Sequence, residues 1–209
     1  MTKNNLFDGL SSRYDEWFEK HKFAYRTEIE LLKKLVPSSG RGLEIGVGTG
    51  RFAEALGIKE GADVSGKMLE RAGKRGIVTT LSPAENLPYE KESFDYALLM
   101  MTICFVDSPE KSLTEAARVL KTGGFLIAGI IDKNSEMGQE YKSKDSPFYK
   151  SATFFSSEEL LGLLTGAGFG NFEIFQSLFG NYKNLTKIDS IEKGCGRGSF
   201  VAIKAEKIK

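Results

Sequence analysis

The sequence predicts an α/β protein, a three-layer α/β/α sandwich with a mostly parallel sheet. Short segments that are apolar on both sides, such as Gly42–Ile45 and Phe125–Ile131, are typical of buried strands. Segments with helical periodicity, such as Arg51–Leu56 and Lys67–Lys74, lie between such strands. Strands that are apolar on both sides and alternate with helices favour a parallel sheet covered on both faces.

The N-terminal segment has helical periodicity. In Phe7–Lys20, the aromatic residues Tyr14, Trp17 and Phe18 recur at helix-like spacing. A second helical pattern follows and ends at Pro37, because proline cannot continue a helix. Two helices are therefore expected before the first strand.

Strands and helices then alternate through the middle of the chain. Gly76 follows one of the helical patterns and Gly123 follows another, as is common at helix ends. The expected strands are Gly42–Ile45, Ala62–Val64, Ile77–Leu81, Phe94–Cys104 and Phe125–Ile131, and the expected helices are Arg51–Leu56, Lys67–Lys74 and Pro109–Leu120.

The last third of the chain departs from this alternation. Ser156–Glu159 opens a helix with a capping sequence, and Gly166 marks the end of that helix. Phe172–Phe175 and Phe200–Ala205 follow with no clear helix between them, so they are expected to pair as antiparallel strands at one edge of the sheet. The connecting stretch, Ser177–Gly198, is long for a structureless loop, and such loops are often functional or mobile.

The composition is that of an ordinary globular domain, with 41% hydrophobic and 27% charged residues. The net charge of +1 gives no attraction to nucleic acid, so none is expected as a partner. Cys104 and Cys195 make no disulfide framework, and Cys104, inside an apolar run, is expected to be buried. Met1–Leu10 does not resemble a signal peptide, and the longest apolar run, Tyr96–Val106, is shorter than the about 20 residues that span a bilayer. We therefore expect a cytoplasmic protein without a membrane partner.

A glycine-rich turn connects the first strand to the next helix. Gly46, Gly48 and Gly50 follow Glu44, and glycine lets a ligand approach the main chain closely. An NAD-binding loop needs the spacing G-x-G-x-x-G, and Arg51 stands where its third glycine would be. A phosphate-binding P-loop needs a lysine followed by serine or threonine, and the turn lacks this pair. The turn therefore indicates a different nucleotide-like ligand.

The spacing Glu44-x-Gly46-x-Gly48-x-Gly50 resembles the first motif of class I S-adenosylmethionine-dependent methyltransferases. The resemblance covers nearly everything after Leu43, and the subtype is similar to small-molecule methyltransferases related to the quinone-pathway enzymes. It implies a Rossmann-like core with S-adenosyl-L-methionine as the cofactor and S-adenosyl-L-homocysteine as its product. The other segments that carry it are Gly61–Leu69, Ala84–Tyr89, Ser93–Tyr96, Ala116–Leu126 and Phe155–Phe169.

The same resemblance implies the organisation of the domain. Residues 1–209 would form one methyltransferase domain, in which 1–38 make a helical cap over the cofactor. Residues 39–209 would form the Rossmann-like core, with insertions on the substrate side around 133–155 and 178–197.

The resemblance also implies a set of cofactor-binding residues. Asp63 would close the second strand and hold the ribose hydroxyls, and Glu44 would shape the loop and reach toward the methionine amino group. Many relatives carry an acid at Pro83 that contacts the adenine amino group, so Glu85 or a backbone carbonyl would take that role here. Tyr14 would donate to the cofactor carboxylate or anchor its helix. The full set is Tyr14, Glu44, Gly46, Gly48, Gly50, Asp63, Val64, Met68, Ala84, Glu85 and Met100.

No residue stands out as a general base, and no metal site is expected. A base is needed only when the acceptor is an alcohol, a phenol or a protonated amine. Thr102 and Cys104 fall where relatives carry polar residues that face the substrate, although Cys104 would also suit simple burial. His21, the only histidine, lies in the N-terminal segment that folds over the cofactor in the resembling family, but it would also suit an exposed position at a helix end. Asp132, at the end of the fifth strand, is a polar candidate for the wall of the site.

The predicted function is methyl transfer from S-adenosylmethionine to a small-molecule nucleophile whose acceptor atom is nitrogen, oxygen or sulfur. A methyltransferase acting on a peptide or RNA is one alternative, although the near-neutral charge disfavours RNA. A protein that binds the cofactor without catalysis is another. A monomer or a homodimer is expected.

Overall fold

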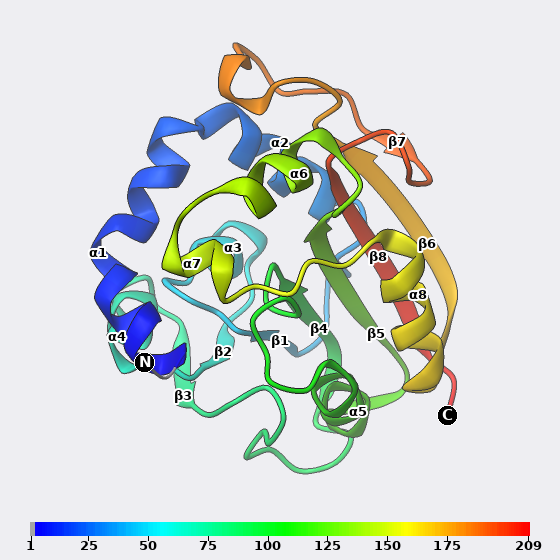
Figure 1. Cartoon of the computed structure of the whole chain (residues 1–209). Helices are drawn as coiled ribbons and strands as arrows, with labels where there is room; N and C mark the ends of the chain where they lie inside the picture. The colour runs from blue at the N-terminus through cyan, green and yellow to red at the C-terminus, as the bar shows by residue number, and fades with distance from the viewer. Residues whose placement is uncertain (1–2) are drawn as a thin grey trace.

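The computed structural model describes residues 3–209, so the first two residues of the predicted domain, and part of the segment compared with a signal peptide, lie outside the described residues. The centre of the described chain is one sheet of eight strands in the order β3-β2-β1-β4-β5-β8-β6-β7 (Figure 1). This mixed sheet with helices on its faces confirms the predicted Rossmann-like α/β fold.

Five strands form the parallel part of the sheet. The chain builds outward from β1 through β2 to β3, then returns to the other side of β1 with β4 and β5. The strands are β1 (Gly42–Ile45), β2 (Glu60–Asp63), β3 (Val78–Leu81), β4 (Phe94–Met100) and β5 (Leu120–Ile131), and the helices between them are α3 (Arg51–Leu56), α4 (Gly66–Lys74) and α5 (Pro109–Val119).

The antiparallel part follows α8 (Ser157–Gly166), whose first turn has the predicted capping box between Ser156 and Glu159. The expected antiparallel pairing is confirmed, with Ile174 of β6 opposite Ile203 of β8. β8 also pairs with β5, so it lies inside the sheet, and the short β7 forms the edge. The strands are β6 (Phe169–Ser177), β7 (Glu192–Lys193) and β8 (Phe200–Lys207).

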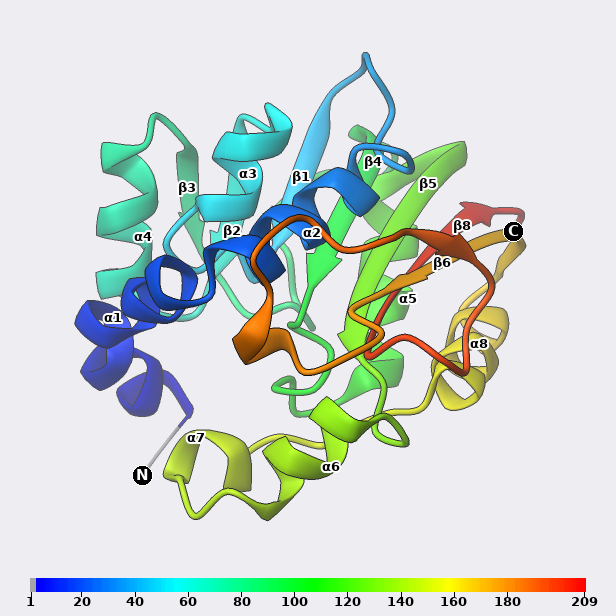
Figure 2. The same ribbon diagram turned by 90° about the horizontal axis from the view of Figure 1, so that it is seen from above.

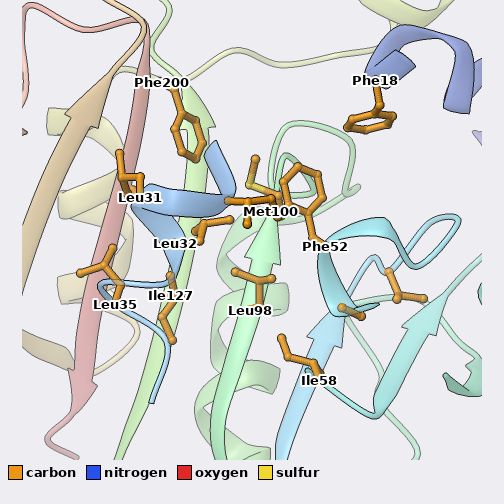
Figure 3. Packing of buried hydrophobic residues seen from close by; sticks show 14 of the residues in the cluster. Phe18, Leu31, Leu32, Leu35, Phe52, Ile58, Leu98, Met100, Ile127 and Phe200 are labelled. Atoms are coloured by element: carbon orange, nitrogen blue, oxygen red, sulfur yellow. The ribbon is translucent and has the colours of Figure 1, made fainter. Parts of the chain in front are cut away.

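Each face of the sheet has its own hydrophobic core. Along β4, Leu98 and Met100 pack with α2 (Lys22–Leu32), whereas Ala97 and Leu99 pack with α5 and α8. This follows from the strand geometry, in which successive side chains point to opposite faces. Figure 3 shows Leu31 and Leu32 of α2 beside Leu98, Ile127 and Phe200 of the sheet. Burying one such leucine side chain contributes about 1.5–3 kcal/mol.

The remaining helices gather at one end of the sheet. They are α1 (Lys3–Lys20) and two helices from the 133–155 segment, α6 (Glu136–Ser143) and α7 (Pro147–Lys150). The start of α1 lies beside α7 in both views (Figures 1 and 2), and the rings of Phe7 and Phe148 are 6.0 Å apart, edge to face. The 178–197 segment holds the 3-10 helix η1 (Tyr182–Asn184) and β7.

One predicted strand is too long. β4 ends at Met100 and does not continue to Cys104, because Met101 has a φ of 54° and the chain turns there. The turn is apolar in sequence because most of its side chains, such as Met101 and Phe105, line the two cavities described below. Among the described residues, no helix is long and apolar enough to cross a membrane.

Candidate active site

The glycine turn has the backbone shape that only glycine takes easily. Gly46 has a φ of 73° and Gly48 a φ of 52°, both in the left-handed region. A Cβ on Gly46 would overlap the side chain of Thr102, whereas a Cβ on Gly48 would meet no atom closer than Tyr14 Cε1 at 3.8 Å. Gly46 therefore allows close packing, and Gly48 leaves open space above the main chain.

Asp63, the last residue of β2, connects the glycine turn to the start of α4. Its Oδ2 accepts a hydrogen bond from the Gly48 N–H at 2.8 Å, and its Oδ1 accepts one from the Ser65 N–H at 2.9 Å. Burial raises the pKa of this carboxyl despite these hydrogen bonds. The acid thus stands at the strand end that the sequence predicted, already oriented by two backbone donors.

A cavity of about 430 Å³ opens beside the turn, at the carboxyl ends of β1, β2 and β4. The sheet changes winding direction between β1 and β4, and ligands of open α/β sheets bind at such a point. All of the predicted cofactor residues except Glu44 and Gly50 line this cavity: Tyr14, Gly46, Gly48, Asp63, Val64, Met68, Ala84, Glu85 and Met100.

Glu44 and Gly50 lie outside the lining of this cavity. Glu44 is buried beneath the turn, where its carboxyl accepts a hydrogen bond from the backbone of Ala53 and burial raises its pKa well above the ordinary range. A Cβ on Gly50 would come within 3.0 Å of the Ala72 backbone, so this glycine lets α3 and α4 approach each other. Both residues shape the turn from behind.

The side of the cavity near Pro83 differs from the expectation. Oε1 of Glu85 accepts hydrogen bonds from the backbone N–H groups of Asp107 and Ser108, at 2.7 and 3.1 Å. Ser82 lines the same cavity, and its buried Oγ has no hydrogen-bond partner within the described chain. Ser82 is not among the residues predicted from the sequence, although its place directly after β3 and before Pro83 is a signal that could have identified it.

A second cavity of about 270 Å³ adjoins the first. Tyr14, Met101, Phe105 and Phe148 line both cavities, so these four side chains form their common boundary. The walls of the second cavity are almost entirely apolar and aromatic, and they come from α1, α2, α3, the turn after β4, β5 and the 133–155 segment. We call this space the aromatic cavity.

Tyr14 stands between the two cavities. Burial raises its pKa above the ordinary range, and the carboxyl groups of Glu44, Asp63 and Glu28 add to the effect. Its hydroxyl therefore stays protonated and can donate a hydrogen bond.

Among the described residues that line the aromatic cavity, Glu28 is the single one with an ionisable acidic or basic side chain of the Asp, Glu, His, Lys or Arg kind. It lies on α2, is 2% exposed, and its Oε1 has no hydrogen-bond partner in the described residues. Burial raises its pKa to about 8. A buried carboxyl oxygen without a partner costs folding free energy, so Glu28 is a candidate for a functional role in the site.

The free energy of unfolding of the ligand-free protein is expected to fall as the pH rises from about 4.5 to about 8. In this window the unfolded chain releases the Glu28 proton at an ordinary pKa of 4.5, whereas the folded protein keeps it up to about 8. Each pH unit then lowers stability by up to about 1.4 kcal/mol. The phenols that face Glu28, Tyr14 and Tyr141, have raised pKa values and stay neutral throughout.

Urea unfolding of wild type and Glu28→Gln at pH about 5 and about 8.5 tests this expectation. The stability of the variant relative to wild type should increase with pH. A difference between the two proteins that does not change with pH would contradict a protonated, buried Glu28.

The predicted catalytic candidates have different surroundings. Thr102 lines the first cavity, and its hydroxyl donates to the Met100 carbonyl at 3.1 Å. Cys104 is half-buried and lines the aromatic cavity, so the expectation of simple burial is wrong. His21 lies outside the lining of both cavities, with its ring next to those of Trp17 and Tyr182. Asp132 also lies outside both and accepts hydrogen bonds from Ser157.

An ionic cluster holds α1 on the glycine turn. Oδ1 of Asp15 accepts hydrogen bonds from Thr49 Oγ1 at 2.7 Å and from Arg51 Nε at 2.8 Å. Its Oδ2 pairs with Arg71 and Arg75, at 3.4 and 3.3 Å. Burial alone would raise the pKa of Asp15, but the hydrogen bonds from Thr49 and Arg51 outweigh it and lower the pKa. The helix that carries Tyr14 is therefore held in place by the contacts of the next residue, Asp15.

Asp15→Asn is expected to weaken binding of S-adenosylhomocysteine several-fold and to lower the free energy of unfolding by about 1–3 kcal/mol, because charge-assisted hydrogen bonds are lost. Calorimetry and urea unfolding measure the two effects. Glu16→Gln, an exposed neighbour on the same helix, is the control and should change neither. Unaltered affinity in Asp15→Asn would show that α1 does not cover the ligand.

Neither cavity offers a metal site. Within residues 3–209, no group of three or more His, Cys, Asp or Glu side chains is arranged to hold a metal ion.

Comparison with known proteins agrees with this fold. Residues 43–128 match the family model of a methyltransferase domain. A crystal structure of an S-adenosylmethionine-dependent methyltransferase from Thermotoga maritima, described as a possible histamine N-methyltransferase, is 49% identical, with a TM-score of 0.96 over 99% of this chain and 100% of that chain. The chain belongs to the class I S-adenosylmethionine-dependent methyltransferases, as its sequence motifs predicted.

Two further relatives match the chain to different extents. An uncharacterized protein of Methanocaldococcus jannaschii is 46% identical over 208 residues, 98% of this chain and 100% of that protein. The ubiquinone/menaquinone biosynthesis C-methyltransferase of Sinorhizobium fredii is 34% identical over 144 residues, 59% of this chain and 56% of that protein. The likeness to the quinone-pathway enzyme thus falls short of the full length of either chain.

Proposed function

We propose that the protein transfers a methyl group from S-adenosylmethionine to a small molecule held in the aromatic cavity. The observation that carries this proposal is the pair of adjoining cavities with Tyr14, Met101, Phe105 and Phe148 as their shared boundary. One cavity has the glycine turn and Asp63, and the other has apolar walls. A donor and an acceptor bound on either side of such a boundary would meet there.

The residues of the first cavity fit the cofactor. The space over Gly48, which a Cβ would fill, suits a ligand in close contact with the main chain. Asp63 supplies an oriented carboxylate for the ribose hydroxyls, and Tyr14 supplies a hydroxyl donor for the cofactor carboxylate. The unpartnered Oγ of Ser82 replaces the missing acid at Pro83 as the polar contact for adenine. When bound, S-adenosylmethionine supplies an activated methyl group.

The protein then has to position the acceptor more than activate it. A correctly oriented nucleophile can gain about 7–11 kcal/mol from positioning alone. The apolar walls of the aromatic cavity would surround an apolar acceptor and reduce its contact with water. At about 270 Å³ the cavity suits a small molecule better than a peptide or RNA segment. The Thermotoga maritima relative, described as a possible histamine N-methyltransferase, also favours a small acceptor.

A methyl-transfer screen tests this function. The full chain would be incubated with S-adenosylmethionine and a panel of small amines, phenols, thiols and carboxylates, and methylated products measured by mass spectrometry. Methylation of at least one panel class is the expected result. Cofactor binding with no turnover on any class would favour a binding protein.

A further inference from the structure

Resting on the proposed function, we propose that Glu28 recognises the acceptor, and that the acceptor is an amine carried on an apolar or aromatic body. The residue combines three properties on the wall of the aromatic cavity. It is 2% exposed, its Oε1 has no hydrogen-bond partner within the described chain, and it lines the cavity itself. A ligand with an N–H donor would provide the missing partner.

The rest of the cavity favours a cation as that partner. No other Asp, Glu, Lys, Arg or His is among the described lining residues, so Glu28 sets the charge preference of the space. Aromatic side chains, including Trp17, Phe18 and Tyr149, line the same cavity, and the faces of aromatic rings attract ammonium groups. An anionic acceptor would face electron-rich rings with no cation among the described lining residues, and it would be repelled by Glu28 whenever that carboxyl is ionised.

The cations near this cavity are already engaged. Lys144 Nζ lies 4.3 Å from the centre of the Tyr141 ring, but Lys144 pairs with Glu140 at 3.0 Å and is not among the lining residues. Arg51 lies over Phe18 and pairs with Asp15 and Glu19. Neither supplies the hydrogen bond that Glu28 Oε1 lacks.

Binding of an ammonium group would change the protonation of Glu28. In the empty cavity, burial raises the pKa of Glu28 to about 8, so the group is mostly protonated at neutral pH. A bound ammonium ion lowers the pKa of a neighbouring carboxyl, and an ion pair forms as the carboxyl releases its proton. Amine binding should therefore release a proton to the buffer, which a purely structural glutamate would not do.

The test uses three ligands of similar shape: 2-phenylethylamine, 2-phenylethanol and 3-phenylpropanoate. Each is titrated by calorimetry into the full chain saturated with S-adenosylhomocysteine, in phosphate and in Tris, whose different ionisation enthalpies reveal proton release. Wild type should prefer the amine over the alcohol and the carboxylate by at least about 10-fold. Glu28→Gln, nearly equal in shape, should lose at least about 30-fold in amine affinity and all of the proton release.

Glu30→Gln is the matched control, because it makes the same change on the same helix at a side chain that is 44% exposed and pairs with Lys33. It should leave all three affinities unchanged. An alcohol that binds wild type as tightly as the amine, an amine affinity unchanged by Glu28→Gln, or no binding of the amine would each overturn the inference. Failure of wild type to bind S-adenosylhomocysteine would instead overturn the proposed function. If the Glu28→Gln variant does not melt cooperatively, the ligand preference and the proton release of the wild-type protein test the inference without it.

Discussion

Asp63→Ala is expected to weaken binding of S-adenosylhomocysteine by about 10- to 100-fold, the effect of losing charge-assisted hydrogen bonds. The variant removes the carboxylate that lines the cofactor cavity and the acceptor for the N–H groups of Gly48 and Ser65. It should therefore also lower the free energy of unfolding. Calorimetry with S-adenosylhomocysteine and urea unfolding measure the two losses separately.

Asp95→Ala is the control for this variant. Asp95 is also an acid that accepts a backbone N–H, from Arg41 at 2.7 Å, but it lies at the amino end of β4, away from the cavity. Its loss should reduce stability and leave cofactor affinity unchanged. If folded Asp63→Ala bound S-adenosylhomocysteine like wild type, the ribose assignment would be wrong.

Gly48→Ala is expected to weaken the binding of S-adenosylhomocysteine by more than about 10-fold, because the added Cβ occupies the space where the ligand would contact the main chain. Its left-handed φ of 52° also costs about 1–2 kcal/mol of stability with alanine. Both effects arise at one residue, so they are separated by a variant that has only the loss of stability from the left-handed backbone.

Gly57→Ala provides that comparison. Gly57 ends α3 with a φ of 75°, and a Cβ there would meet no atom within 4 Å. It should lose about 1–2 kcal/mol of stability in the same way, with no change in ligand affinity. Equal affinities for Gly48→Ala and Gly57→Ala would mean that the cofactor does not lie against the glycine turn.

The sequence was sufficient to predict the parts of the molecule that depend on local pattern. Apolar strands that alternate with helices predicted the parallel sheet, and the resemblance to the methyltransferase family placed Asp63 at the end of the second strand. The strand Phe94–Cys104 was overextended, because apolar residues that line a cavity look the same in sequence as residues that fill a core. Only the backbone turn at Met101 distinguishes the two.

The substrate side could not be predicted, because it depends on tertiary packing between distant segments. Helix α7 and the start of α1 are far apart in the sequence, yet the rings of Phe148 and Phe7 lie 6.0 Å apart. Glu28 left a faint signal, since it stands between Ala24 and Leu31 on the buried stripe of α2, where a charged residue is out of place. A charged residue on an apolar helix face indicates a functional position when the folded structure places it in the wall of a cavity.

The most direct test of this account is calorimetric titration of the wild-type chain with S-adenosylhomocysteine, together with its thermal unfolding. We expect saturable one-to-one binding at submillimolar ligand and a rise in melting temperature as the ligand concentration increases. No heat of binding at millimolar ligand, in a protein that unfolds cooperatively, would contradict the assignment of the cavity between Gly48 and Asp63.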